Sequence, residues 1–98
     1  MAIIELTRFR VAADRREALL ASRPDMLRDF GEDREGFIDA RLVELPEGEW
    51  LDIVRWRSAD DFAVSREKGA NRPGIQAFFG AISELVSSEQ GVEAEVAA

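Results

Sequence analysis

Apolar and polar residues alternate in three segments of the chain: 2–11, 37–45 and 49–57. Alternation with a period of two is typical of a β-strand that has one buried face. The first segment is also apolar on its second face near its start, where Ile4 and Leu6 lie opposite Ile3, and this is typical of a strand covered on both sides. The short turn 46–48 joins the second and third strands into a predicted hairpin.

The residues between the first two strands predict a helix. Asp14 has the residue type of an N-cap, and Glu17 stands three positions later, as in a capping box. Apolar residues then recur at helical spacing as far as Phe30. Pro24 lies inside this pattern and is expected to bend the helix or to split it, because proline lacks the N–H that the helix needs.

The second half of the chain predicts two further helices and a last strand. Ser58 is the expected cap of a helix that ends near Gly69, and Asn71 is the expected cap of another that has Pro73 in its first turn. A short strand is expected at 92–96, where valine and alanine alternate with glutamate. Helical spacing of apolar residues is strongest in Ile75, Phe78, Phe79, Ile82, Leu85 and Val86.

The order of elements is therefore β-α-β-β-α-β, with the second helical region split. This order predicts an α+β fold of the ferredoxin-like type, in which an antiparallel sheet carries helices on one face. We expect a single domain over residues 1–98. Because the first strand is apolar on both faces, we also expect a second copy of the chain to cover the other face in a symmetric homodimer.

The amino-acid composition excludes several kinds of catalytic and metal site. The 98 residues include no cysteine, histidine or tyrosine and only one lysine, which excludes disulfides, thiolate or imidazole metal ligands and Cys- or His-based nucleophilic catalysis. The net charge of −7 disfavours nucleic acid and anionic membranes as partners. No apolar run is long enough to span a membrane, so the expected location is the cytoplasm.

The third strand carries the most informative polar residue. Trp50, Asp52 and Trp56 fall on one face of it. A carboxyl group that lost its water there would have a raised pKa and could act as a general acid or base. Alternatively, Asp52 pairs with an arginine on a neighbouring strand, such as Arg41 or Arg8, and both indoles belong to the core.

Aromatic residues of the helical layer give a candidate binding site. Phe62, Phe78 and Phe79 are expected to cover the sheet as core residues, but the same side chains could line a pocket for a flat apolar ligand. Asn71 is either a helix cap or a contact to that ligand. No metal site is expected, because neither adjacent pair of acids has the spacing of a calcium loop.

Residues 50–62 resemble the strand–helix signature of antibiotic biosynthesis monooxygenase domains. In that family a W-x-S unit ends the third strand and an aromatic residue follows on the next helix, which corresponds here to Trp56, Ser58 and Phe62. The turn 34–37 is also similar to the family's glycine–apolar start of the second strand.

The resemblance implies a dimeric α/β barrel and, for the enzymes of the family, oxygenases that need no cofactor and act on anthrones, quinols or related aromatic polyketides. It implies a pocket role for Trp56. Two polar groups of some members are changed, because Asp52 stands in place of an asparagine and Phe62 in place of a tyrosine. Haem degradation is disfavoured, since the chain has no histidine for the iron.

These residues lead to two hypotheses about function, one for an enzyme and one for a binding protein. In the first, the protein is a cofactor-independent oxidoreductase in which Asp52 takes a proton from an aromatic substrate, Trp56 orients that substrate, and Trp50, Phe62, Phe78 and Asn71 contact it. In the second, it is a non-catalytic dimer that binds an apolar small molecule. A domain whose own aromatic residues fill the pocket is a third possibility.

Overall fold

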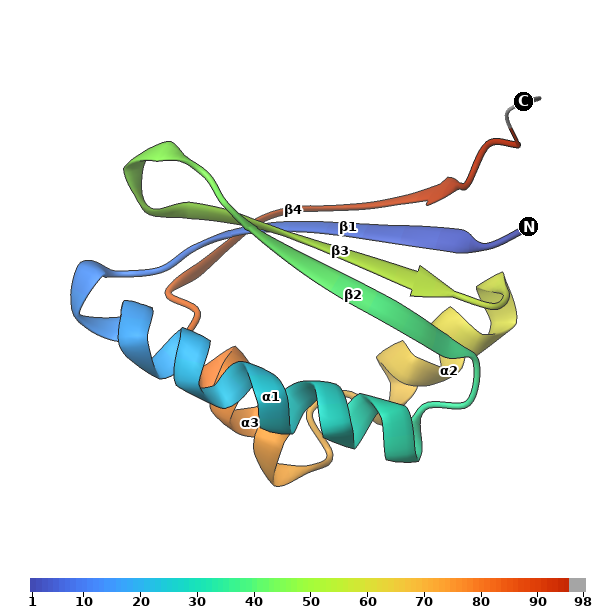
Figure 1. Ribbon diagram of the computed structural model, residues 1–98, viewed down its shortest axis with the longest axis horizontal. Helices are drawn as coiled ribbons and strands as arrows, with labels where there is room; N and C mark the ends of the chain where they lie inside the picture. Colours follow the sequence, from blue (N-terminus) through green and yellow to red (C-terminus); the bar gives the residue numbers. More distant parts are fainter. Residues whose placement is uncertain (96–98) are drawn as a thin grey trace.

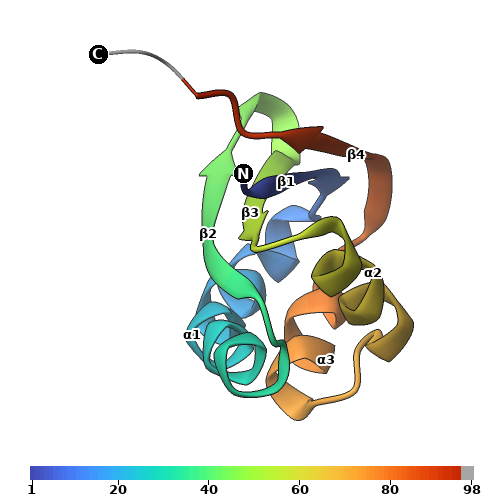
Figure 2. The ribbon, with the colours of Figure 1, turned by 90° about the vertical axis from the view of Figure 1, so that its right-hand side faces the viewer.

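One antiparallel sheet and three helices make up the part of the chain that the computed structural model describes, residues 1–95. The sheet has the strand order β2-β3-β1-β4, and its strands are β1 (Ile3–Arg10), β2 (Phe37–Glu44), β3 (Glu49–Trp56) and β4 (Glu84–Val92). The helices, all on one face of the sheet (Figures 1 and 2), are α1 (Arg16–Asp33), α2 (Ala59–Lys68) and α3 (Pro73–Gly80). The predicted ferredoxin-like α+β fold is confirmed.

The two central strands bring their inward-facing residues into register. Strand β1 pairs with β3 so that Thr7 lies opposite Asp52 and Phe9 lies opposite Trp50. Cross-strand partners project from the same face of a sheet, and Phe9 and Trp50 are both buried in the core beneath the helices. The face of β3 that carries the two tryptophans is therefore the one that meets the helices.

The last helix is shorter than its apolar spacing predicts, and the last strand begins earlier. Helix α3 ends at Gly80, and the segment from Glu84 onward pairs with β1 instead of continuing the helix. Glycine is a poor helix former, and the free edge of β1 offers backbone hydrogen bonds to an extended chain. The predicted strand at 92–96 is wrong, because β4 ends at Val92; residue 96 lies outside the described residues.

Two further expectations concern the first helix, and of these the split at Pro24 and the cap at Asp14 are wrong. Helix α1 runs unbroken through Pro24, which lies on its exposed side. Packing of α1 against the sheet and α3 outweighs the one backbone hydrogen bond that proline removes. Asp14 does not cap the helix, because it lies in a short 3₁₀ turn over Ala13–Arg15. Helix α1 begins after this turn, and no side chain caps its start.

Helix α3 packs closely on α1. A Cβ atom on Gly74 would lie 2.6 Å from the backbone carbonyl of Asp25, so only glycine allows the two helices this approach. The predicted cap Asn71 does not cap α3. Instead, the Asp29 carboxylate of α1 accepts a hydrogen bond of 2.8 Å from the Gly74 N–H, which satisfies one free donor at the start of α3.

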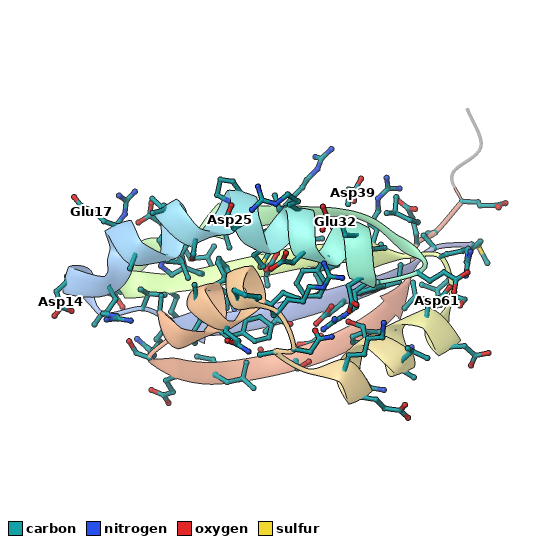
Figure 3. All side chains as sticks on the ribbon, turned by 90° about the horizontal axis from the view of Figure 1, so that it is seen from below. Asp14, Glu17, Asp25, Glu32, Asp39 and Asp61 are labelled. Atoms are coloured by element: carbon teal, nitrogen blue, oxygen red, sulfur yellow. The ribbon has the colours of Figure 1, made fainter. Side chains whose placement is uncertain are left out.

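The outward side of α1 carries exposed charged residues of both signs, and Arg28 pairs there with Asp25. Asp25 and Glu32 project from it into solvent (Figure 3). Within residues 1–95, no helix has both the length and the apolar character needed to cross a membrane.

Candidate functional site

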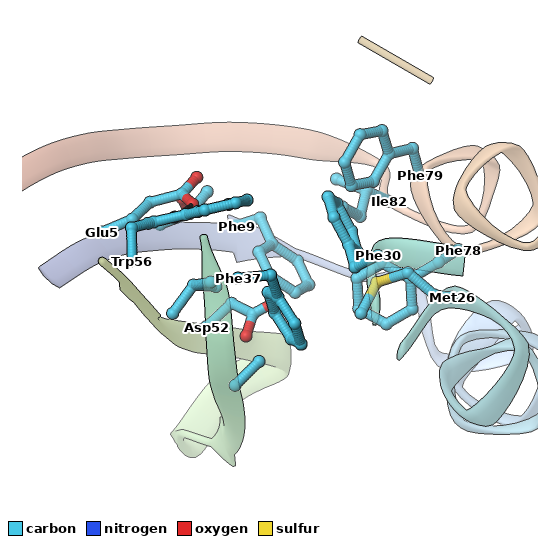
Figure 4. Close-up of a pocket in the computed structure, with 13 residues that line it drawn as sticks. Glu5, Phe9, Met26, Phe30, Phe37, Asp52, Trp56, Phe78, Phe79 and Ile82 are labelled. Carbon is cyan, nitrogen blue, oxygen red and sulfur yellow. Dashed lines mark hydrogen bonds between the residues drawn. The ribbon is translucent and has the colours of Figure 1, made fainter. Parts of the chain in front are cut away.

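A cavity of about 90 Å³ lies between the sheet and the helices (Figure 4). Its walls are aromatic and aliphatic, and among residues 1–95 only two charged side chains, Glu5 and Asp52, reach it. The lining residues are Glu5, Thr7, Phe9, Met26, Phe30, Phe37, Ala40, Asp52, Val54, Trp56, Phe78, Phe79 and Ile82. The site is thus a largely apolar chamber with a few polar groups, the usual composition of a small-molecule site.

Trp56 forms one end of the cavity and is held by aromatic neighbours. Its side chain is buried, and Phe62 of α2 stacks on it with ring centroids 5.8 Å apart and an interplanar angle of 21°. Helix α2 starts directly after β3 because the Ser58 hydroxyl accepts a hydrogen bond from the Asp61 N–H, as the sequence predicts. The W-x-S unit therefore fixes the indole through the helix that follows it.

The indole N–H of Trp56 points at a second carboxylate of the cavity. It donates a hydrogen bond of 3.0 Å to Oε1 of Glu5, and the hydroxyl of Thr7 donates one of 3.3 Å to Oε2. Burial raises the pKa of Glu5 above its ordinary value, and the nearby Asp52 charge adds to this effect, while the two hydrogen bonds oppose it. Glu5 is a carboxylate of increased basicity that faces an apolar chamber.

Asp52 lies on the floor of the cavity and forms a nearly buried ion pair. Both of its oxygens accept hydrogen bonds from Arg23 of α1, at 2.6 and 2.9 Å, and both side chains are about one-tenth exposed. The expectation of an arginine partner is thus correct, but Arg41 and Arg8 are the wrong arginines. The partner comes from the helical layer because Asp52 faces the helices and not the outer face of the sheet.

The structure brings together three of the six residues that the sequence suggests for the site. Asp52, Trp56 and Phe78 line the cavity. Phe62 lies behind Trp56 and does not reach the chamber, and Trp50 packs in the core with Arg16 against its ring. Trp50 and Phe62 can support the walls of the cavity from outside it.

Asn71 belongs to a different cluster, around Arg34. Its side-chain oxygen accepts a hydrogen bond of 2.6 Å from Arg34, and its amide donates one of 3.1 Å to Asp33. Arg34 also donates to the hydroxyl of Ser65 and to the carbonyl of Gly69. The hydrogen bonds from Asn71 and Arg34 lower the pKa of Asp33 to about 2. This cluster fastens the loop between α2 and α3 to the end of α1.

Three polar residues of the site were not singled out from the sequence: Glu5, Thr7 and Arg23. Glu5 and Thr7 occupy the same face of the first strand as Ile3 and Phe9, so the period-two pattern contains the signal for both. Arg23 carries no comparable signal, because its pairing with Asp52 joins two residues 29 positions apart. Within residues 1–95, no group of three or more acidic side chains is placed to hold a metal ion.

Comparisons with known proteins agree on the architecture. A candidate antibiotic biosynthesis monooxygenase from Bordetella bronchiseptica superposes with a TM-score of 0.78 at 16% identity, over 96% of this chain and 98% of its own. SnoaB, a cofactor-independent oxygenase from Streptomyces nogalater, gives 0.68 at 18% identity, over 98% and 95%. A candidate antibiotic biosynthesis monooxygenase from Caulobacter crescentus gives 0.73 at 13%, over 96% and 91%.

The chain has the fold of the antibiotic biosynthesis monooxygenases. No protein-family model matches the sequence, and no curated protein matches it either. The resemblance carried by residues 50–62 is thus confirmed at the level of the fold. In this fold, Trp56 of the W-x-S unit and the carboxylates of Glu5 on β1 and Asp52 on β3 all line the same cavity.

Proposed function

We propose that this protein is a cofactor-independent monooxygenase that oxidises a hydroxylated aromatic substrate in the cavity beside Trp56. One observation carries the proposal: a desolvated carboxylate, Glu5, lies at the end of an aromatic chamber. Similarity to the fold of SnoaB supports the choice of reaction. In this proposal Glu5 takes the place that the sequence suggested for Asp52, because Arg23 already occupies both oxygens of Asp52.

Hydroquinone is the simplest substrate of this kind. Glu5 removes a phenolic proton, and the resulting anion gives an electron to O₂; the two radicals then join at a ring carbon as a hydroperoxide. The proton that Glu5 removed completes this hydroperoxide. Glu5 then takes the hydrogen of the same ring carbon as a proton while the O–O bond breaks, so that a carbonyl forms there and hydroxide departs. The hydroxide receives that proton from Glu5, and the products are water and, after a proton shift between its oxygens, 2-hydroxy-1,4-benzoquinone. The substrate is oxidised by four electrons and one molecule of O₂ accepts them, so no other reductant is required.

Oxygen uptake by the purified protein with hydroquinones and anthrones, without added metal or flavin, tests this function. We expect substrate-dependent uptake by the wild type and its loss in Ala40→Leu, because the larger side chain fills the cavity from β2. Ala21→Leu adds the same atoms on the exposed side of α1 and should keep the activity. Ligand binding without oxygen uptake would instead establish the alternative, a non-catalytic binding protein.

We further propose that the protein works as a homodimer joined through the outer face of the sheet. None of the helices that the structure describes covers this face (Figure 2), which carries the half-buried apolar side chains Ile4, Leu6, Leu51 and Ile53. Two-fold pairing of such a face would remove these side chains from water. We expect sedimentation equilibrium to give twice the 11.0 kDa of one chain and Ile53→Glu to give the monomer; a monomeric wild type would contradict the proposal.

A further inference from the structure

The charge of the cavity is unbalanced. Among its lining residues only Glu5 and Asp52 are charged, and Arg23 neutralises Asp52. Within the described part of the chain, Glu5 accepts hydrogen bonds only from the neutral groups of Trp56 and Thr7. The remaining cation that acts on Glu5 is Arg66 of α2, which lies over the Phe62 ring outside the cavity and is itself exposed. With Glu5 ionised, a ligand in the chamber therefore meets one uncompensated negative charge in an apolar surrounding.

The cavity is also small, and among its lining side chains only Phe79 is exposed. Its volume of about 90 Å³ is below the ~150 Å³ of an engineered cavity that takes up benzene. The inner walls belong to the packed core, since Phe9, Trp56 and Phe78 are each 1% exposed. Phe79, at the opposite end from Glu5 in Figure 4, is 44% exposed. Moving a half-exposed side chain costs far less than repacking a core, so space for a ligand opens there.

We infer that the cavity selects uncharged phenols or hydroquinones with a single ring, and that Glu5 rejects rings that carry a carboxylate. This inference rests on the proposed function for the identity of the site, and it narrows the aromatic substrates considered there. A displaced Phe79 makes room for one ring between the core walls, with a hydroxyl directed at Glu5. A second fused ring has to displace core side chains. An anionic substituent loses its hydration inside the chamber and is repelled by the carboxylate.

Calorimetric titration without oxygen separates this selectivity from turnover. The first pair of ligands is hydroquinone and 2,5-dihydroxybenzoate, which differ by one carboxylate. At neutral pH we expect hydroquinone to bind at least tenfold more tightly. The ratio should fall below threefold in Glu5→Gln. Glu17→Gln, which removes a charge from an exposed position of α1, should leave it unchanged.

A ring series tests the size limit. The ligands are hydroquinone, 1,4-dihydroxynaphthalene and 9,10-dihydroxyanthracene, and the larger two bury more apolar surface, which alone would favour them. We nevertheless expect each of them to bind the wild type at least tenfold more weakly than hydroquinone. Phe79→Ala widens the end of the cavity where Phe79 lies, so this preference for the single ring should shrink in that variant. Val64→Ala, at an exposed position of α2, should retain the preference.

Several outcomes would overturn the inference: equal binding of the carboxylated ring, a ratio that survives in Glu5→Gln, or tighter binding of the fused rings. Wild-type protein gives an independent check, because acidification that protonates Glu5 should narrow the ratio without any substitution. Selective binding together with no oxygen uptake would refute only the proposed monooxygenase. Oxygen uptake with unselective binding would refute only the selectivity.

Discussion

Replacing Arg23 by methionine is expected to lower the free energy of unfolding by about 3–5 kcal/mol, because it leaves the charge of Asp52 uncompensated beneath the helices. Both side chains of the pair are about one-tenth exposed, and Arg23 reaches both oxygens of the carboxylate. The guanidinium also lies 5.1 Å from the centre of the Phe78 ring. Methionine preserves much of the packing volume and removes the charge, so the loss reports on the ion pair.

Urea unfolding of wild type and variant measures this effect. Arg28→Met is the matched control, because Arg28 pairs with Asp25 on the same helix but both side chains are more than half exposed; exposed pairs contribute about 1 kcal/mol or less. The double variant Arg23→Met/Asp52→Leu should recover most of the lost stability, since no unpaired charge remains. A loss in Arg23→Met no greater than in Arg28→Met would show that the pair does not stabilise the core.

The faces of the first three strands could be predicted because alternation is a local signal. Trp50, Asp52 and Trp56 are spaced by even numbers of residues, so they share a face whatever covers it. Which element covers this face depends on contacts between residues that are far apart in the sequence. The sequence left open whether these residues meet the helices or a second chain, and the helical layer decides the matter by supplying Arg23 and Phe62.

The segment after Gly80 shows where local pattern fails. Phe78, Phe79, Ile82 and Leu85 have helical spacing, but their environments differ: Phe78 is buried, Phe79 and Leu85 are exposed, and Leu85 belongs to β4. The pairing of β4 with β1 joins residues about eighty positions apart. The local sequence allows both a helix and a strand here, and the pairing with β1 stabilises the strand. A short stretch of sequence does not include both partners of this contact, so it cannot predict the outcome.

Part of the candidate site could be predicted, because some of its residues also carry a local signal in the sequence. Trp56 was found through a motif and Asp52 through its apolar neighbours. Glu5 was overlooked because a single glutamate near the start of a strand is most often a solvent-facing residue. Its importance arises from the Trp56 indole, 51 positions away, which becomes its hydrogen-bond donor only when β1 and β3 pair.

Glu5→Gln is expected to lower turnover by about 10²–10⁴-fold while leaving hydroquinone binding almost unchanged, because a positioned general base contributes about this much to a rate. Glutamine is nearly isosteric with glutamate. Its oxygen can still accept from the Trp56 indole and its amide can donate to the Thr7 hydroxyl, but it cannot take a proton. Steady-state oxygen uptake gives turnover and KM separately. Asp52→Asn provides the comparison for the base suggested by the sequence, and loss of turnover in that variant alone would return the role to Asp52.

The same substitution should make the protein more stable, and this sets it apart from ordinary damage to the core. Because burial raises the pKa of Glu5 above its ordinary value of 4.5, folding favours the protonated form. The stabilising contribution of that protonation is complete below pH 4.5 and is lost as the pH rises through the folded-state pKa. Glu5→Gln should therefore exceed the wild type in free energy of unfolding by about 1 kcal/mol at neutral pH. Its advantage should shrink on acidification. Wild-type turnover should rise with pH across the same window, since only the ionised carboxylate accepts the substrate proton. A variant that is less stable at neutral pH, or as active as the wild type, would show that Glu5 serves only to hold the indole of Trp56.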